Sequence, residues 1–117
     1  MSLQHRIAVF VPSTINANES ASAEVIAKWI TAAKMTFARL FGGFTAHNAV
    51  GGWVSPEHGL IEEQVTVVAS FTDEDGLGFV EKIKEFAAEM ALALNQEAVS
   101  VEFDNQLEFV SPLTVAA

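Results

Sequence analysis

The chain has 117 residues and a formal net charge of −9, with six Lys and Arg against fifteen Asp and Glu. Half of the residues are apolar and none is a cysteine, which excludes a disordered chain, a disulfide scaffold, a zinc finger and thiol catalysis. The scarcity of basic residues argues against a nucleic-acid partner, because phosphate contacts need clustered Lys and Arg. We therefore expect a single acidic domain.

No segment has the length of a membrane span. The longest apolar run near the start covers residues 7–11, and no later run reaches the roughly eighteen apolar residues that a span needs. We expect a cytoplasmic protein without a membrane partner. Residues 4–111 are predicted to form the domain and residues 112–117 a tail, and residues 1–3 are set aside as a cloning remnant.

The first elements are a strand and a helix. Residues 4–11 alternate weakly between two faces and stop at Pro12, which predicts a strand. Apolar residues then recur at three- and four-residue spacing from Ile26 to Phe41, and two glycines follow. This pattern predicts an amphipathic helix of about twenty residues.

The middle of the chain has the pattern of a β-hairpin. Residues 44–54 have β character but contain Gly51 and Gly52, which predicts a bent or bulged strand. After a turn cluster, residues 60–71 have the clearest strand pattern in the chain. The two strands are therefore expected to pair.

A second helix and one or two strands complete the pattern. Residues 72–75 have the capping residue and acids of a helix start, and an apolar stripe runs from residue 80 to 94. Residues 97–103 alternate again, and residues 107–110 are a candidate extra strand. The order β-α-β-β-α-β predicts an α+β fold, the ferredoxin-like sandwich, in which two helices cover one face of a four-stranded antiparallel sheet.

The sheet face that the helices leave open is predicted to be nearly uncharged and partly apolar. Such a face usually pairs with a second subunit or covers a ligand cavity. We therefore expect a homodimer through the open face. Strand parity assigns to this face Ala8, Phe10, Gln64, Thr66, Val68, Ala98 and Ser100.

Glu63 is the unusual residue of the hairpin. Parity places it beside Val65 on the helix-facing side of the sheet, where a carboxylate needs a partner. Candidate partners are the His47 imidazole, the Trp53 indole and the Thr45 hydroxyl. The functional hypothesis makes Glu63 and His47 a general acid/base pair in a pocket walled by Trp53. The structural hypothesis makes Glu63 a satisfied anchor that fixes the hairpin register.

The same hairpin supplies the residues predicted to bind a small ligand, namely Thr45, Asn48, Trp53 and His58. His47, His58 and a glutamate are the side chains that could form a metal site. The spacing of the two histidines matches no defined motif, so no metal is predicted. The nucleophile and zinc signatures Gly-x-Ser-x-Gly and His-Glu-x-x-His are absent, and no cofactor is expected.

The hairpin also carries a pattern of the form G-x-T-x5-G-x-W-x9-E, from Gly43 and Thr45 through Gly51 and Trp53 to Glu63. This pattern resembles the centre of a family of small uncharacterised bacterial and phage proteins, described as a domain of unknown function. Here Asn48-Ala49 stands where that family has an acidic residue and Ala. The resemblance implies that the motif residues belong together, and it brings no activity with it.

Two functions follow from these observations. The leading hypothesis is a non-enzymatic, dimeric module of the bacterial cytosol, phage- or mobile-element-encoded, that binds a partner or small ligand. The alternative is a small cofactor-independent enzyme, with acid/base or monooxygenase-like chemistry, that uses Glu63 and His47 beside Trp53. Dimeric ferredoxin-like domains host such enzymes, which is an analogy from the fold.

Overall fold

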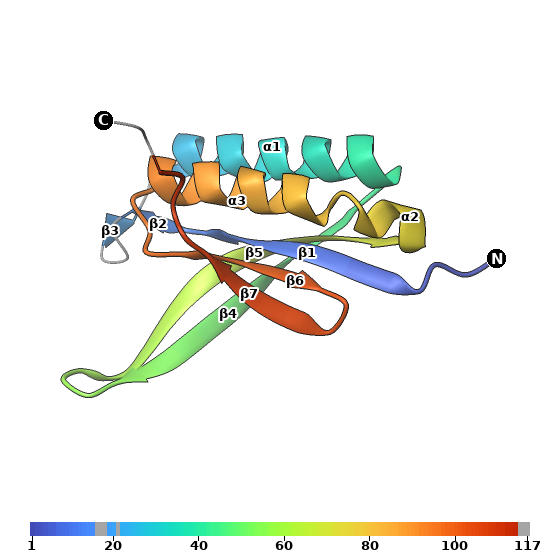
Figure 1. Cartoon of the computed structure of the whole chain (residues 1–117). Coiled ribbons are helices and arrows are strands. Elements are labelled where there is room, and N and C mark those ends of the chain that lie inside the picture. The colour runs from blue at the N-terminus through green and yellow to red at the C-terminus, as the bar shows by residue number, and fades with distance from the viewer. Residues whose placement is uncertain (16–18, 21, 115–117) are drawn as a thin grey trace.

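The computed structural model describes residues 1–15, 19–20 and 22–114, and it has two layers, helices on one side and a sheet on the other (Figure 1). The strands of the main sheet are β1 (His5–Pro12), β4 (Thr45–Ser55), β5 (Gly59–Thr72), β6 (Val99–Phe103) and β7 (Gln106–Val110). A separate short pair is formed by β2 (Thr14–Ile15) and β3 (Glu19–Ser20). The helices are α1 (Ala23–Phe41), α2 (Glu74–Leu77) and α3 (Val80–Ala93).

The main sheet is antiparallel and has the strand order β4-β5-β1-β6-β7. The predicted α+β class, with helices on one face of an antiparallel sheet, is confirmed (Figure 1). The sheet has five strands where the prediction counted four, because β7 pairs with β6 at the edge. Asp104 and Asn105 both have positive φ between these strands, as a tight two-residue hairpin turn requires.

The starts of α1 and α2 each use a short polar side chain as a cap. The Ser22 hydroxyl accepts a hydrogen bond from the Val25 N–H at the start of α1, and Gly42 ends that helix in the left-handed region. The second predicted helix is divided into α2 and α3. The Asp73 carboxylate accepts from the Gly76 N–H, and Gly76 packs so closely on Thr72 that no side chain fits there.

The core lies between the helices and the sheet. Its buried side chains come from β1, β5 and β6 on the sheet and from α1 and α3 above it. Phe37 of α1 is fully buried and contacts Phe41 edge-on, with ring centroids 5.5 Å apart. No helix in the described part of the chain is long and apolar enough to cross a membrane.

The two faces of β5 are the reverse of the prediction. Val9 of β1 pairs with Val68, and both are buried in the core beneath the helices. Val67 instead lies on the open face, in a second apolar cluster with Ala8. Because neighbouring residues of a strand alternate between faces, Glu63 shares the open face with Val67. The prediction that Glu63 faces the helices is therefore wrong.

The β4–β5 hairpin extends beyond the helical layer, and its tip lies far from α1 and α3 (Figure 1). Every residue of β4 pairs with one of β5 in a single unbroken register, so the bulge predicted at Gly51 and Gly52 is absent. At the tip, the Ser55 hydroxyl accepts hydrogen bonds from the N–H groups of Glu57 and His58, both at 3.2 Å. This turn fixes the register, and the register fixes which side chains meet.

Candidate functional site

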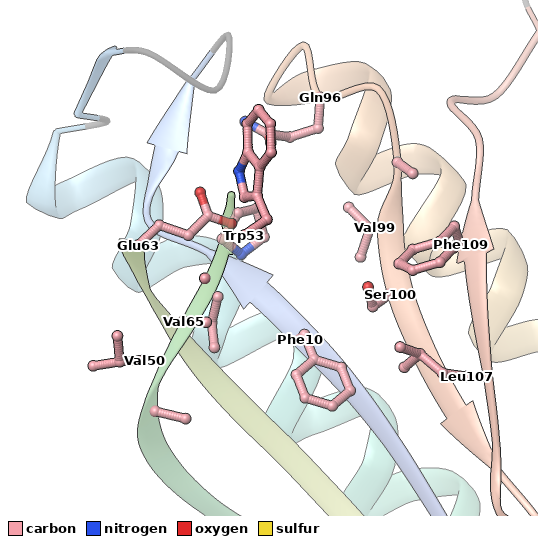
Figure 2. A pocket seen from close by; sticks show the side chains of 15 residues that line it. Phe10, Val50, Trp53, Glu63, Val65, Gln96, Val99, Ser100, Leu107 and Phe109 are labelled. Atoms are coloured by element: carbon pink, nitrogen blue, oxygen red, sulfur yellow. The ribbon is translucent and has the colours of Figure 1, made fainter. Parts of the chain in front are cut away.

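The open face of the sheet contains a cavity of about 550 Å³. Phe10 of β1 and Val65 of β5 form its floor, Trp53 and Glu63 stand on the hairpin side, and Phe109 of β7 stands opposite (Figure 2). The β4–β5 and β6–β7 hairpins splay apart on the side away from the helices (Figure 1), and residues of both hairpins line the cavity. The volume is in the range of small-molecule sites, roughly 300–1,000 Å³.

Glu63 gives this cavity its charge. It is the only ionisable side chain among the described residues that line the cavity. It is half-buried, and within the described chain its carboxylate has no hydrogen bond or ion pair. Gly51 pairs with Glu63 across the hairpin, so the position directly opposite the carboxylate has no side chain. A half-buried carboxylate without a protein partner is available to a cationic or hydrogen-bond-donating ligand.

Aromatic rings make up much of the remaining wall. The Trp53 side chain is 59% exposed and lines the cavity instead of the core. Phe10 and Phe109 present two further rings from β1 and β7 (Figure 2). Such rings bind flat heterocycles by stacking and bind cations through their π faces. The cavity therefore combines one negative charge with an aromatic surface.

Gln96 and β7 are the parts of this site that the sequence analysis missed. The Gln96 side-chain amide donates to the carbonyl oxygens of Thr14 at 2.7 Å and Leu94 at 3.4 Å, which holds it at the cavity edge. Phe109 of β7 pairs with Ser100 of β6, and in this register the Phe109 ring points to the open face of the sheet. The alternation within residues 106–110 is the signal that identifies the cavity-facing positions of β7.

The structure separates the two residues of the proposed acid/base pair. His47 pairs with Val67, and Glu63 lies four residues before Val67 in β5. At the rise of an extended strand this places Glu63 about 13 Å from His47. His47 lines a different hollow, together with Thr45, and is exposed there. Glu63 and His47 therefore do not form a pair within hydrogen-bond reach.

The other predicted ligand residues lie outside the first cavity. Asn48 is on the opposite face of the hairpin, where its Oδ1 accepts from the Thr66 hydroxyl at 3.3 Å. His58 lies in the hairpin turn, exposed, with Nε2 3.8 Å from a Glu57 carboxylate oxygen. Within the described residues, no group of three or more His, Cys, Asp or Glu side chains is arranged to hold a metal ion. Of the predicted set, Glu63 and Trp53 line one cavity together.

No family model matches the chain, and no curated protein matches it. Two solved structures do match it over nearly its whole length. A phage SAM lyase in complex with S-methyl-5'-thioadenosine is 14% identical, with a TM-score of 0.63 over 95% of this chain and 94% of that one. A phage SAM lyase in the apo state is 15% identical, with a TM-score of 0.60 over 97% of this chain and 94% of that one. At these identities the likeness shows a shared fold.

These two structures overturn the leading functional hypothesis. This chain shares its fold with two structures of an enzyme, which contradicts the prediction of a non-enzymatic module and favours the alternative. The phage origin of both structures agrees with the expectation of a phage-related protein. The motif resemblance to a family of unknown function stays a prediction.

Proposed function

We propose that this protein is an enzyme that binds S-adenosylmethionine in the open-face cavity and cleaves it to S-methyl-5'-thioadenosine. The shared fold with the phage SAM lyase supports the reaction class. The observation that carries the proposal is the unpartnered Glu63 carboxylate in a cavity whose other described lining residues are uncharged and largely apolar.

The chemistry of S-adenosylmethionine fits this lining. The molecule carries a sulfonium and an α-ammonium cation, together with a flat adenine ring. Glu63 is a carboxylate that can accept hydrogen bonds from the ammonium group, and no basic side chain of the cavity opposes a cation. Trp53, Phe10 and Phe109 supply apolar rings on which adenine can stack and against which the thioether can pack.

The proposed reaction breaks the bond between the sulfonium and the γ-carbon of the amino-acid part. Both electrons of that bond go to sulfur, which becomes the neutral thioether of S-methyl-5'-thioadenosine. As that bond breaks, the carboxylate of the same four-carbon fragment attacks the γ-carbon, which closes a lactone ring and needs no base from the protein. Because no water is consumed, the reaction is that of a lyase.

The positive charge on sulfur disappears during this reaction. The cavity can therefore accelerate the reaction by favouring the neutral form of sulfur. Apolar side chains that exclude water from around sulfur favour the neutral thioether over the sulfonium, so they stabilise the transition state relative to the bound substrate. A carboxylate next to sulfur would have the reverse effect. We therefore assign Glu63 to the α-ammonium group and the rings of Phe10 and Phe109 to the thioether end. His47 takes no part, because it lies about 13 Å from Glu63 at the rise of an extended strand.

The test is to incubate the purified protein with S-adenosylmethionine and to quantify S-methyl-5'-thioadenosine by liquid chromatography and mass spectrometry. The Glu63→Gln variant is expected to lose about tenfold or more in kcat/KM, because the charge-assisted hydrogen bond to the ammonium group is lost. Glu62→Gln is the matched control, because Glu62 pairs with Gly52 and points to the opposite face. Absence of the thioether product, or equal rates for both variants, would contradict the proposal.

Three predictions from the sequence stay proposals beside this one. The ferredoxin-like classification is supported by the two-layer arrangement, and the observed order differs from a four-stranded sheet by the added β7. A cytoplasmic location is supported by the proposed substrate, which cells make internally. A homodimer through the open face is supported by the exposed apolar side chains Trp53, Leu107 and Phe109 on it.

A further inference from the structure

A second hollow of about 400 Å³ lies where α1 leads into β4, at the end of the sheet away from the hairpin tip. Four polar side chains line it, Arg6 of β1, Thr45 and His47 of β4, and Ser70 of β5. Phe44 and Phe71 are exposed at the same place and give it an aromatic wall. Neither the proposed reaction nor its cavity uses these residues.

The charge of this second hollow is opposite to that of the first cavity. Among its described lining residues there is an arginine and a histidine but no carboxylate. Lys34 of α1 adds a further positive charge, with its Nζ 5.9 Å from the centroid of the Phe44 ring. The whole chain has only six Lys and Arg, so this grouping stands out against a net charge of −9.

Arg6 is also incompletely satisfied. Its Nε is buried and has no hydrogen bond among the described residues. The nearest carboxylate oxygen is Oε2 of Glu102, at 3.5 Å, which is an ion pair too long for a good hydrogen bond. The Arg6 side chain as a whole is 37% exposed and lines the hollow, so its guanidinium is accessible to an anionic ligand there.

We propose that this second hollow binds a small aromatic carboxylate, with its carboxylate on the Arg6 guanidinium and its ring against Phe44 and Phe71. A planar carboxylate matches the fork of N–H groups that an arginine presents. The carbonyl groups at the end of α1, around Gly42, carry partial negative charge and disfavour a doubly charged phosphate. The aromatic wall calls for an apolar body on the anion.

The second site is independent of the proposed reaction. Thr45 and His47 lie on the same face of β4 as Gly51, which is opposite Glu63. Thr45 is six residues before Gly51 and His47 is four residues before it. The two hollows therefore share one sheet face but have no described lining residue in common. If the protein had no lyase activity, the second hollow could still bind its ligand. If the second hollow bound no ligand, the lyase proposal would be unaffected.

The test is a titration of the ¹⁵N-labelled protein with benzoate, followed by NMR. Saturable shifts are expected at the amides of Phe44, Thr45 and Phe71. Benzyl alcohol is the neutral control, and it is expected to cause only weak shifts that do not saturate. Equal responses to the two probes would overturn the proposal, since the site would then recognise the ring alone. Absence of saturable benzoate shifts at these amides would overturn it as well.

Two variants should move the benzoate affinity in opposite directions. Arg6→Gln removes the proposed anion partner and is expected to weaken benzoate by about tenfold or more, since a charge-assisted bidentate contact is lost. Glu102→Gln removes the carboxylate that competes for Arg6 and is expected to strengthen benzoate binding. If Arg6→Gln fails to fold, the Glu102→Gln result decides, because unchanged or weaker benzoate binding there would overturn the assignment.

Discussion

Gly51 lies directly opposite Glu63 in the β4–β5 ladder, so no side chain of β4 stands directly across from the carboxylate. A Cβ built at Gly51 meets no atom within 4 Å. The glycine φ also lies outside the left-handed region that excludes other residues. Neither packing nor backbone conformation therefore requires glycine at this position, and its effect is to leave Glu63 open to the cavity.

Gly51→Val is expected to fold and to be more stable than the parent by about 0.5–1 kcal/mol, because glycine weakens a strand. The added side chain should cover Glu63 and weaken the binding of S-adenosylmethionine. Chemical denaturation and calorimetric titration measure the two effects. Gln64→Val is the control, because the Gln64 side chain lies on the opposite face of the hairpin from Glu63. This substitution should leave the binding of S-adenosylmethionine unchanged. Normal affinity in Gly51→Val would refute the argument.

Trp53→Ala separates a binding role from a packing role. Because the Trp53 ring is 59% exposed, its removal is expected to cost less than about 1 kcal/mol of folding stability while weakening the ligand. Trp29 is the matched control, since it packs on the core and its ring lies 5.8 Å from that of Phe86. Trp29→Ala should cost roughly 2–4 kcal/mol in the same denaturation experiment. A large stability loss from Trp53→Ala would mean that the ring is structural.

Glu63→Gln tests the structural hypothesis for this carboxylate. If Glu63 accepted buried hydrogen bonds, the substitution would cost about 1–3 kcal/mol. Within the described chain the carboxylate has no such bond, so the free energy of unfolding is expected to change by less than about 0.5 kcal/mol. Denaturant unfolding of this variant beside Glu62→Gln measures the difference. A loss as large as that of a buried hydrogen bond would restore the structural anchor.

The elements were predictable because their signals are local. The spacing of apolar residues and Gly42 define α1, and the acids before residue 76 mark the start of the second helical region. Even the added strand β7 was visible as a short apolar piece before Pro112. Helix caps and strand alternation depend on neighbours in sequence, so one chain is sufficient to find them.

The site was harder to predict because it depends on register. Val65, Val67, Val68 and Ala69 make both faces of β5 apolar, one for the core and one for the cavity, so alternation does not reveal which face the helices cover. The pairing of Val9 with Val68 decides this, and it is a contact between segments far apart in the sequence. The distance between Glu63 and His47 likewise depends on the hairpin register.

Lys84 connects α3 to the β7 wall of the cavity. Its Nζ lies 3.1 Å from Oε2 of Glu108, and the hydrogen bond with that carboxylate is the main cause that raises the pKa of Lys84 above its ordinary value of 10.5. Because the pKa of Lys84 is raised in the folded state, the interaction with Glu108 stabilises the fold fully at pH values below the pKa of Lys84 in the unfolded chain. It is lost as the pH rises through the higher folded value.

Lys84→Met removes the charge, and with it the contact of Nζ with the Phe103 ring, whose centroid lies 4.9 Å away. It is expected to lower the stability at neutral pH by about 0.5–1 kcal/mol, as for a solvent-accessible ion pair. The difference from the parent should shrink above about pH 10.5. Ligand binding should also weaken, since Leu107 and Phe109 flank Glu108 and line the cavity. Urea denaturation across the pH range checks this, and a difference that persists at high pH would contradict the ion pair.

The open face predicts the assembly of the protein. Trp53, Leu107 and Phe109 are 59%, 53% and 68% exposed there, and contiguous apolar surface of this kind usually marks an interface. We expect a homodimer by native mass spectrometry and by light scattering after size exclusion. Phe109→Lys should shift it toward monomer, whereas Val54→Lys should not, because Val54 is equally exposed but on the opposite face of the hairpin. A monomeric parent, or dissociation by the Val54 variant alone, would show that the open face is not the interface.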